Sequence, residues 1–334
     1  MGVLYRGVHR PSGKAVAIKT LSDEQMSVRR NIECLRVEYE MAREIRHPNV
    51  VHFMDFWERD GKPFLAMELI EGVDLRVRLS VGHLPIEEGI EVAKGAAMAL
   101  QAVHESDAKR PIVHADVKPE NLMLRAGQGP LRKERVALVD FGTAIPAHAM
   151  RDPVGRALAR VRQIFRGPRV VGGSSLYMSP EQASSNDEDI DPRSDIYSLG
   201  AVLFEIFTGR PPFLNQADEK IFAKHGRLPV TATGREFREQ FNEEIRLKHV
   251  NQTLPAPRRF NPNLPDAVEA IVMRCLEKKP ERRFRSAFEL LTALASLRVH
   301  PDGSVTATRN LHGHDRRRAD ASRPDEPERR SAVR

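Results

Sequence analysis

The hydrophobic pattern of this chain changes near Gly72, and that change limits the folds that the chain can adopt. Before Gly72, short runs rich in β-forming residues alternate with turn residues around one long charged segment that has the composition of a helix. After Gly72, apolar residues recur at steps of three and four, the period of a helix that buries one face. We therefore expect an α+β chain of two lobes, in which a small antiparallel sheet with one long helix precedes a larger, mostly helical part.

The pattern also predicts where the elements lie. Strands are expected at 3–8, 15–20, 50–57 and 63–68, and the long helix at 28–45. Later helices are expected near 86–100, 195–208, 266–276 and 287–297, with an added helix inside an insertion at 226–250. These elements make one domain over 1–297, with a smaller lobe at 1–70 and a larger one at 71–297. The remainder, 298–334, is an Arg-rich tail with few apolar residues, and we expect it to be disordered from about Pro301 on.

Composition excludes several classes of protein. No apolar run approaches the roughly 18 residues that cross a bilayer, and no signal pattern opens the chain, so we expect a cytoplasmic protein without a membrane span. The net charge of +7 is not gathered into a basic stripe with interleaved aromatics, which argues against nucleic-acid binding. Cys34 and Cys275 are expected to be buried thiols rather than a disulfide or a redox site.

Four short motifs carry the chemistry, and each is weak when taken alone. They are Val16-Ala17-Ile18-Lys19 at the end of a strand, Glu38 on the long helix, His114-Ala115-Asp116-Val117-Lys118-Pro119-Glu120-Asn121, and Asp140-Phe141-Gly142 after the strand-like run 136–139. In this order and spacing they resemble the catalytic domain of eukaryotic-like (Hanks-type) serine/threonine protein kinases of the bacterial type. The resemblance implies the two-lobe kinase fold and phosphoryl transfer from ATP.

The resemblance also assigns roles to residues. Lys19 would pair with Glu38 and reach the α- and β-phosphates, Asp116 would orient or accept the proton of the attacking hydroxyl, and Lys118 would neutralise the transferring phosphoryl. Asn121 and Asp140 would hold Mg²⁺, a hard ion that takes oxygen ligands. Phosphoryl transfer needs this arrangement because it depends on positioning and charge compensation.

The adenine site follows from position in the same family. After Met67, the backbone of Glu68 and Ile70 would hydrogen-bond the base. Three apolar side chains would enclose its ring, and they can pack in the core at the same time: Leu4, Ala17 and Met123. Further matches have structural roles: Arg283 would pair with Glu181 of Ser179-Pro180-Glu181, 195–200 would anchor the catalytic loop, and His114 is expected to pack in the core.

The chain departs from the family at its start. Kinases of this family carry a glycine-rich loop over the phosphates, and Gly2 matches only the third glycine of that loop. We expect that the first strand and two glycines lie upstream in a longer native chain.

The second departure concerns activation. Ala115 stands where an arginine usually receives an activating phosphate, and Thr143 is the only hydroxyl residue between Gly142 and Gly173. We expect that phosphorylation inside this loop does not switch the enzyme on, with Ser174 and Ser175 as sites just beyond it. An Arg-rich helix at 152–167 of the loop is either a solvated surface or a docking surface for an acidic partner.

Three functions follow from these motifs. The leading one is a serine/threonine protein kinase that moves the γ-phosphoryl of Mg-ATP to a protein hydroxyl, with ATP and a protein substrate as its partners. The alternatives are a pseudokinase scaffold, disabled by the missing glycine-rich loop, and a small-molecule kinase.

Overall fold

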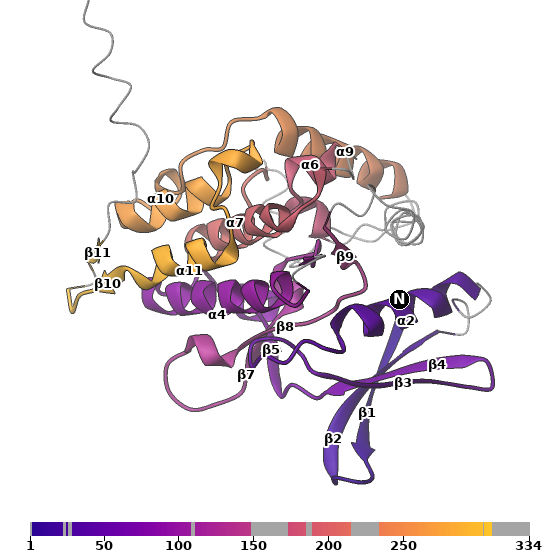
Figure 1. Ribbon diagram of the computed structural model, residues 1–334. Helices are drawn as coiled ribbons and strands as arrows, with labels where there is room; N and C mark the ends of the chain where they lie inside the picture. The colour runs from indigo at the N-terminus through magenta and orange to yellow at the C-terminus, as the bar shows by residue number, and fades with distance from the viewer. Residues whose placement is uncertain are drawn as a thin grey trace, which may run out of the picture.

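The computed structural model describes residues 2–22, 25, 29–107, 111–147, 173–184, 189–214, 234–302 and 304–308. The described chain forms two lobes (Figure 1), with strands and one helix in the first and stacked helices in the second. The expected α+β, two-lobe arrangement is therefore confirmed.

The first lobe is built on a four-stranded antiparallel sheet in the order β1-β2-β4-β3. Helix α2 packs against this sheet and buries Leu35 and Ala42. The sheet and helix are β1 (Gly2–His9), β2 (Lys14–Leu21), α2 (Arg29–Ala42), β3 (Phe53–Arg59) and β4 (Lys62–Glu68).

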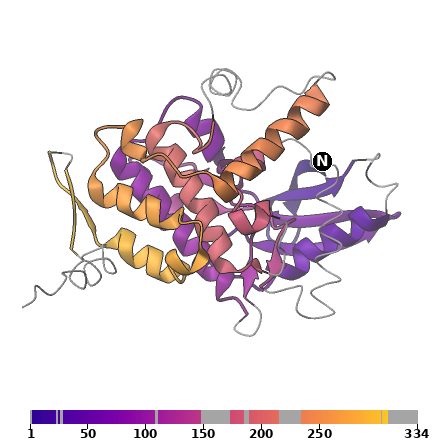
Figure 2. The ribbon, with the colours of Figure 1, turned by 90° about the horizontal axis from the view of Figure 1, so that it is seen from above.

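The second lobe is organised around α7 (Pro192–Thr208), in which every residue from Ser194 to Phe207 is buried. The helix begins where the Asp191 side chain accepts a hydrogen bond from the Arg193 backbone, with Pro192 in the first turn. Helices pack around it, as Figure 2 shows from above. They are α4 (Ile86–His104), α10 (Asp266–Cys275) and α11 (Ala287–Ala295).

Short elements between the large helices position the functional loops. Two small sheets, β5-β7-β8 and β6-β9, lie between the first lobe and the large helices of the second (Figure 1). These elements are β5 (Gly72–Asp74), α3 (Leu75–Leu79), β6 (Ile112–Val113), η1 (Pro119–Asn121), β7 (Leu122–Arg125), η2 (Lys133–Arg135), β8 (Val136–Leu138), β9 (Ile145–Pro146), η4 (Gly173–Leu176), α6 (Pro180–Ala183), η6 (Pro257–Arg259) and η7 (Pro280–Arg282).

The added helix predicted in the insertion is confirmed as α9 (Gly234–Asn251). Its residues Phe241 and Ile245 are buried, and the helix contacts α6 and η4. Helix α9 therefore packs on η4 and α6, which follow Asp140-Phe141-Gly142 along the chain.

The third strand was predicted to begin at Val50, which is wrong. Val50 forms a parallel bridge with Leu138, and the Val51 N–H donates to the Leu138 carbonyl at 3.0 Å. Residues 50–52 therefore dock on β8 of the second lobe before the chain enters the first sheet at Phe53. Glu68 completes this crossing, because its N–H donates to the carbonyl of His52 at 2.8 Å.

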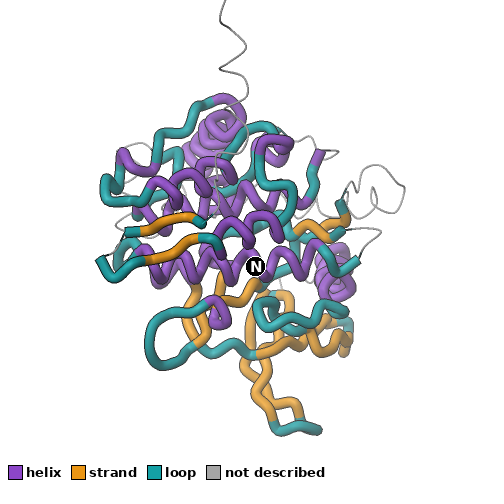
Figure 3. Tube along the Cα trace, turned by 60° about the vertical axis from the view of Figure 1, so that its left-hand side comes forward, coloured by secondary structure: helices purple, strands orange, loops and turns teal. Residues whose placement is uncertain are grey.

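The end of the chain also differs from expectation. Disorder was predicted from about Pro301, but β10 (Leu297–Val299) and β11 (Val305–Ala307) form an antiparallel hairpin, seen as two short orange strands in Figure 3. Val299, Val305 and Ala307 pack against the main core, and their alternation is masked by the polar residues around them. Residues 309–334 lie outside the described part.

Two expectations from composition can be compared with the fold. Cys34 and Cys275 are free and buried, as predicted. Burial raises the pKa of the Cys275 thiol to about 12. Within the described ranges, none of the helices has the length and apolar character that a membrane crossing requires.

Candidate active site

Three charged side chains from separate elements meet at one point. The Lys19 ammonium, on β2, donates to both carboxylate oxygens of Glu38 on α2, at 2.8 and 2.9 Å. It also donates to Asp140 Oδ1 at 2.8 Å, just beyond β8. The predicted Lys19–Glu38 pair is therefore present, and Asp140 joins it, so all three ammonium N–H groups are engaged.

Burial and charge set the protonation of this group. Burial alone lowers the pKa of Lys19, but the carboxylates of Glu38 and Asp140 outweigh it and raise that pKa. Burial raises the pKa of Glu38 to about 7, because Lys19 offsets only part of the cost of desolvation. Burial also acts to raise the pKa of Asp140, yet Lys19 dominates and lowers it to about 2. Asp140 is therefore ionised throughout the neutral range.

A second group lies on the loop that begins at His114. Lys118 Nζ donates to Asp116 Oδ2 at 2.6 Å, and the Asn121 amide donates to the same oxygen at 3.1 Å and to the Asp116 carbonyl at 2.8 Å. Burial acts to lower the pKa of Lys118, but the nearby carboxylates, Asp116 foremost, together outweigh burial, so the pKa of Lys118 is raised. Asp140 follows Val139, whose N–H donates to the backbone carbonyl of Asn121 at 3.0 Å, so the two groups lie within electrostatic reach of each other; both lysines act to lower the pKa of Asp140.

Helix α7 holds this loop in place. Asp195 is fully buried and accepts hydrogen bonds from the backbone N–H groups of His114 and Ala115, at 2.8 and 2.7 Å. Ala115 has a φ of 62°, an unfavourable conformation for a residue with a Cβ, and the Gln182 amide donates to its carbonyl at 2.9 Å. The predicted anchoring by α7 is confirmed.

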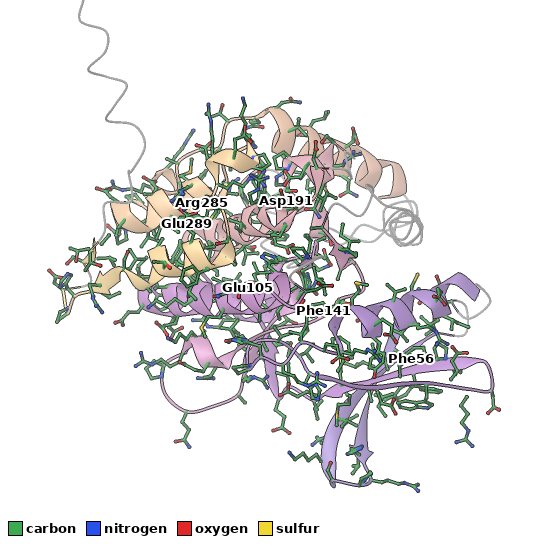
Figure 4. The ribbon with its side chains drawn as sticks, viewed as in Figure 1. Phe56, Glu105, Phe141, Asp191, Arg285 and Glu289 are labelled. Carbon is green, nitrogen blue, oxygen red and sulfur yellow. The ribbon has the colours of Figure 1, made fainter. Side chains whose placement is uncertain are left out.

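Aromatic packing joins the two lobes beneath the site. Phe141 is buried where the sheet-and-helix lobe meets the helical lobe (Figure 4). Its ring lies edge-on to Phe53 of β3 at 5.8 Å and to His114 at 4.9 Å. His114 has no exposed surface, and its Nε2 contacts the Val139 carbonyl at 3.1 Å, so its predicted packing role is confirmed.

The segment that returns to the site at Gly173 is also fixed. Arg283 donates to both oxygens of Glu181, at 2.7 and 2.9 Å, which confirms the predicted pair. Ser174 Oγ accepts from Lys118 Nζ at 2.9 Å, and Ser175 Oγ donates to Asn242 of α9 at 2.8 Å. The two hydroxyls named as phosphorylation sites thus already have partners. The Arg-rich loop helix at 152–167 lies outside the described residues.

The residues expected around adenine lie on strands that frame the same region. Ala17 on β2 is buried and faces Met67 on β4 in register. Leu4 on β1 is 63% exposed. The backbone N–H of Glu68 donates to the carbonyl of His52, so a hydrogen bond from the Glu68 backbone to a ligand would have to use the Glu68 carbonyl. The Ile70 backbone lies just past the end of β4, and its adenine contact stays a prediction.

Met123 and Gly2 complete the predicted nucleotide residues. Met123 on β7 is half-buried and pairs with Ala137. A Cβ at Gly2 would lie 2.7 Å from the Thr20 carbonyl, so the close approach of β2 requires glycine there. Its phosphate contact stays a prediction.

Sequence reasoning did not find two contacts. The sequence indicates Ser174 only as a phosphorylation site, and nothing local indicates that it reaches Lys118 across the fold. No local pattern singles out Arg76, although its guanidinium contacts Glu120 of the catalytic loop at 3.1 Å. Both contacts join residues that are far apart in sequence, so no spacing rule could reveal them.

Comparison with known proteins agrees with this geometry. Residues 1–293 match the protein kinase domain family. A probable serine/threonine-protein kinase of Clostridium perfringens is 28% identical over 92% of this chain and 38% of its own length. Serine/threonine-protein kinase PknB of Mycobacterium leprae is 30% identical over 84% of this chain and 38% of its own length.

A solved structure resembles the fold. The PknI kinase domain of Mycobacterium tuberculosis superposes with a TM-score of 0.56 at 22% identity, covering 88% of this chain and 90% of that chain. The chain spans less than half the length of the curated relatives cited above. Because the family match covers nearly all of the described fold, the chain belongs to the protein kinase domain family.

Proposed function

We propose that this chain is an active serine/threonine protein kinase that transfers the γ-phosphoryl of Mg-ATP to a protein Ser or Thr hydroxyl. One observation carries the proposal: Lys19, Glu38 and Asp140 form one ion-paired group, and Lys118, Asp116 and Asn121 form a second group within its electrostatic reach. Phosphoryl transfer requires such a cluster of fixed charges around the phosphates.

The acceptor side fits the role proposed for Asp116. Its Oδ2 accepts from Lys118 and Asn121, which fixes the carboxylate and leaves Oδ1 to meet an incoming hydroxyl. Lys118 bridges Asp116 and Ser174, so its charge lies beside the proposed base. An orienting carboxylate with an adjacent cation supports proton acceptance from the hydroxyl and compensation of phosphoryl charge.

The nucleotide side fits Mg²⁺ through its donor chemistry. The side-chain amide nitrogen of Asn121 donates to Asp116, so the side-chain oxygen Oδ1 of Asn121 is the atom left for a ligand. Asp140 carries a pKa of about 2 and supplies an ionised carboxylate. These hard oxygens are what Mg²⁺ prefers, and the ion would supply charge neutralisation on the phosphates. Lys19 would reach a phosphate by giving up its hydrogen bond to Asp140, while its hydrogen bonds to Glu38 would hold the side chain in place.

A transfer assay tests the proposal. The unaltered chain should label a protein acceptor from γ-labelled ATP on Ser or Thr, and Asp116→Asn should lower kcat by about 10²- to 10⁴-fold. Asp60→Asn is the matched control, because Asp60 lies at an exposed turn with a φ of 52°, which Asn tolerates. Equal rates for Asp116→Asn and the unaltered chain would refute the role of Asp116.

The absence of any transfer by the folded, unaltered chain would instead favour the scaffold. No observation within the described residues favours that alternative at present. The Arg-rich helix expected at 152–167, which lies outside the described residues, stays a proposed docking surface for an acidic partner.

A further inference from the structure

A buried ionic cluster lies beside the catalytic loop and has no part in the chemistry proposed above. Arg76 of α3 donates from Nε to Glu120 Oε1 at 3.1 Å, and its two terminal nitrogens bind Glu205 of α7 at 2.5 and 3.2 Å. Its guanidinium also contacts the hydroxyl of Tyr177, which donates to Glu205 Oε2 at 2.5 Å. One guanidinium thus joins three side chains.

The cluster is shielded from water, which makes its geometry stiff. The side chain of Arg76 is 12% exposed and that of Glu205 is 2% exposed, and Tyr177 is buried. The guanidinium fork grips both oxygens of Glu205, a planar contact that a lysine cannot reproduce. Burial and Glu205 raise the pKa of Tyr177 well above its usual value, so this phenol remains a donor.

The three partners of Arg76 belong to segments that form the acceptor side of the site. Glu120 lies between Lys118 and Asn121, both of which contact Asp116. Tyr177 ends the turn that begins at Ser174, and its N–H donates to the Ser174 carbonyl at 3.2 Å. Ser174 in turn contacts Lys118.

The third partner belongs to the helix that supports the loop. Glu205 lies on α7, whose Asp195 holds the backbone of the catalytic loop. The nucleotide-side group of Lys19, Glu38 and Asp140 comes from other elements: β2, α2 and the residues after β8. Arg76 therefore joins the catalytic loop, the 174–177 turn and α7 on one side of the site.

We propose that Arg76 is a positioning residue for the acceptor side: it fixes the 174–177 turn, and with it Ser174 and Lys118, relative to Asp116. The proposal rests on the proposed kinase function. It implies that the protein acceptor depends on Arg76, whereas ATP binding does not. An internal ion pair then orders this turn without a phosphate group.

Arg76→Leu tests the proposal, with Arg78→Leu as its control on the same helix. Arg78 forms an ion pair with Glu88 at 3.4 Å, and both side chains are about 30% exposed. Steady-state kinetics are measured with an acceptor protein that the unaltered chain phosphorylates. Arg76→Leu should lower kcat/KM for the acceptor about 100-fold and leave the KM for ATP unchanged. Arg78→Leu should change neither.

Two more variants separate positioning from folding. Arg76→Leu leaves Glu205 buried without its cation, so Arg76→Leu combined with Glu205→Gln removes that charge. If this double variant has the circular dichroism of the unaltered chain, its acceptor kcat/KM should stay low. Tyr177→Phe keeps every buried charge paired and removes one hydroxyl, and it should lower acceptor kcat/KM about tenfold.

Each result decides the proposal. Unaltered acceptor kcat/KM in the folded double variant or in Tyr177→Phe would overturn it. Parallel losses in acceptor kcat/KM and ATP affinity would also overturn it, because they would indicate general damage. If the unaltered chain transfers no phosphoryl while Asp116→Asn matches it, the kinase function itself fails, which is a different result.

Discussion

Arg283→Met is a sharp test of how the helical lobe is held together. The Arg283 side chain is fully buried and donates to both oxygens of Glu181, at 2.7 and 2.9 Å. It also donates to the backbone carbonyls of Arg193, Glu277 and Lys278. Methionine fills a similar volume but supplies none of these donors.

The structure sets the size of the effect. After the substitution, Glu181 stays buried with Ser194 Oγ, at 2.6 Å, as its remaining side-chain donor. Removing one partner of a buried ion pair costs about 3–5 kcal/mol, because the other charge is left uncompensated. For a domain of this size, that corresponds to a fall in Tm on the order of 10 °C. Adding Glu181→Gln should recover part of the loss.

Urea denaturation followed by circular dichroism measures the change in the free energy of unfolding, since most helix lies in this lobe. The single Trp57 lies on β3, so its fluorescence follows the other lobe separately. Arg285→Met is the control, because Arg285 is 88% exposed and its pair with Glu289 is worth about 0.5 kcal/mol at most. A loss below about 1 kcal/mol for Arg283→Met would refute the reasoning.

Three further predictions follow from local environments. Glu38 has a pKa of about 7, so kcat/KM for ATP should fall about tenfold per pH unit below pH 7, as protonation removes the negative charge of Glu38 beside Lys19. The Glu38→Gln variant should be slow, and its pH–rate profile should lack this acidic limb. Burial lowers the pKa of His249 from 6.5 to about 3, so as the pH falls the unfolded chain binds a proton before the folded chain does. The free energy of unfolding should therefore fall by up to about 1.4 kcal/mol per pH unit below pH 6.5. Urea denaturation at several pH values should show this slope in His9→Gln but not in His249→Gln. Gly72→Ala should cost more than about 1 kcal/mol in urea denaturation, because Gly72 has a φ of 153° and a Cβ there would lie 2.0 Å from the Leu124 carbonyl; an unchanged midpoint would contradict this.

The lobes and the charged site could be predicted because their signals are local. Val16 to Lys19 lies in a short run rich in β-forming residues, and 114–121 is a compact loop whose order of residues matches one known motif. The two members of the Lys19–Glu38 pair, and of the Arg283–Glu181 pair, are distant in sequence. These pairs could therefore be predicted only from the family resemblance.

The misses have physical causes. The run 50–52 has strand composition, yet its hydrogen bonds go to Leu138 of the other lobe, and composition does not specify a partner. The β10–β11 hairpin is stabilised by apolar side chains, Leu297 among them, that pack with a core already built by the helices. Arg76 resembles any helix arginine until the fold brings Glu120 and Glu205 to it.

The docking of residues 49–52 has a mechanical consequence for the lobes. The chain passes between them at this segment and again after β4, and the Glu68–His52 hydrogen bond ties the two passages together. Because the two crossings are tied together, we expect the sheet of the first lobe to rotate about a line through 49–52 and 68–72 rather than to slide along that line. Lys19 belongs to the first lobe and Asp140 to the second. The distance between Lys19 Nζ and Asp140 Oδ1, which is 2.8 Å here, therefore measures the separation of the two lobes at the site.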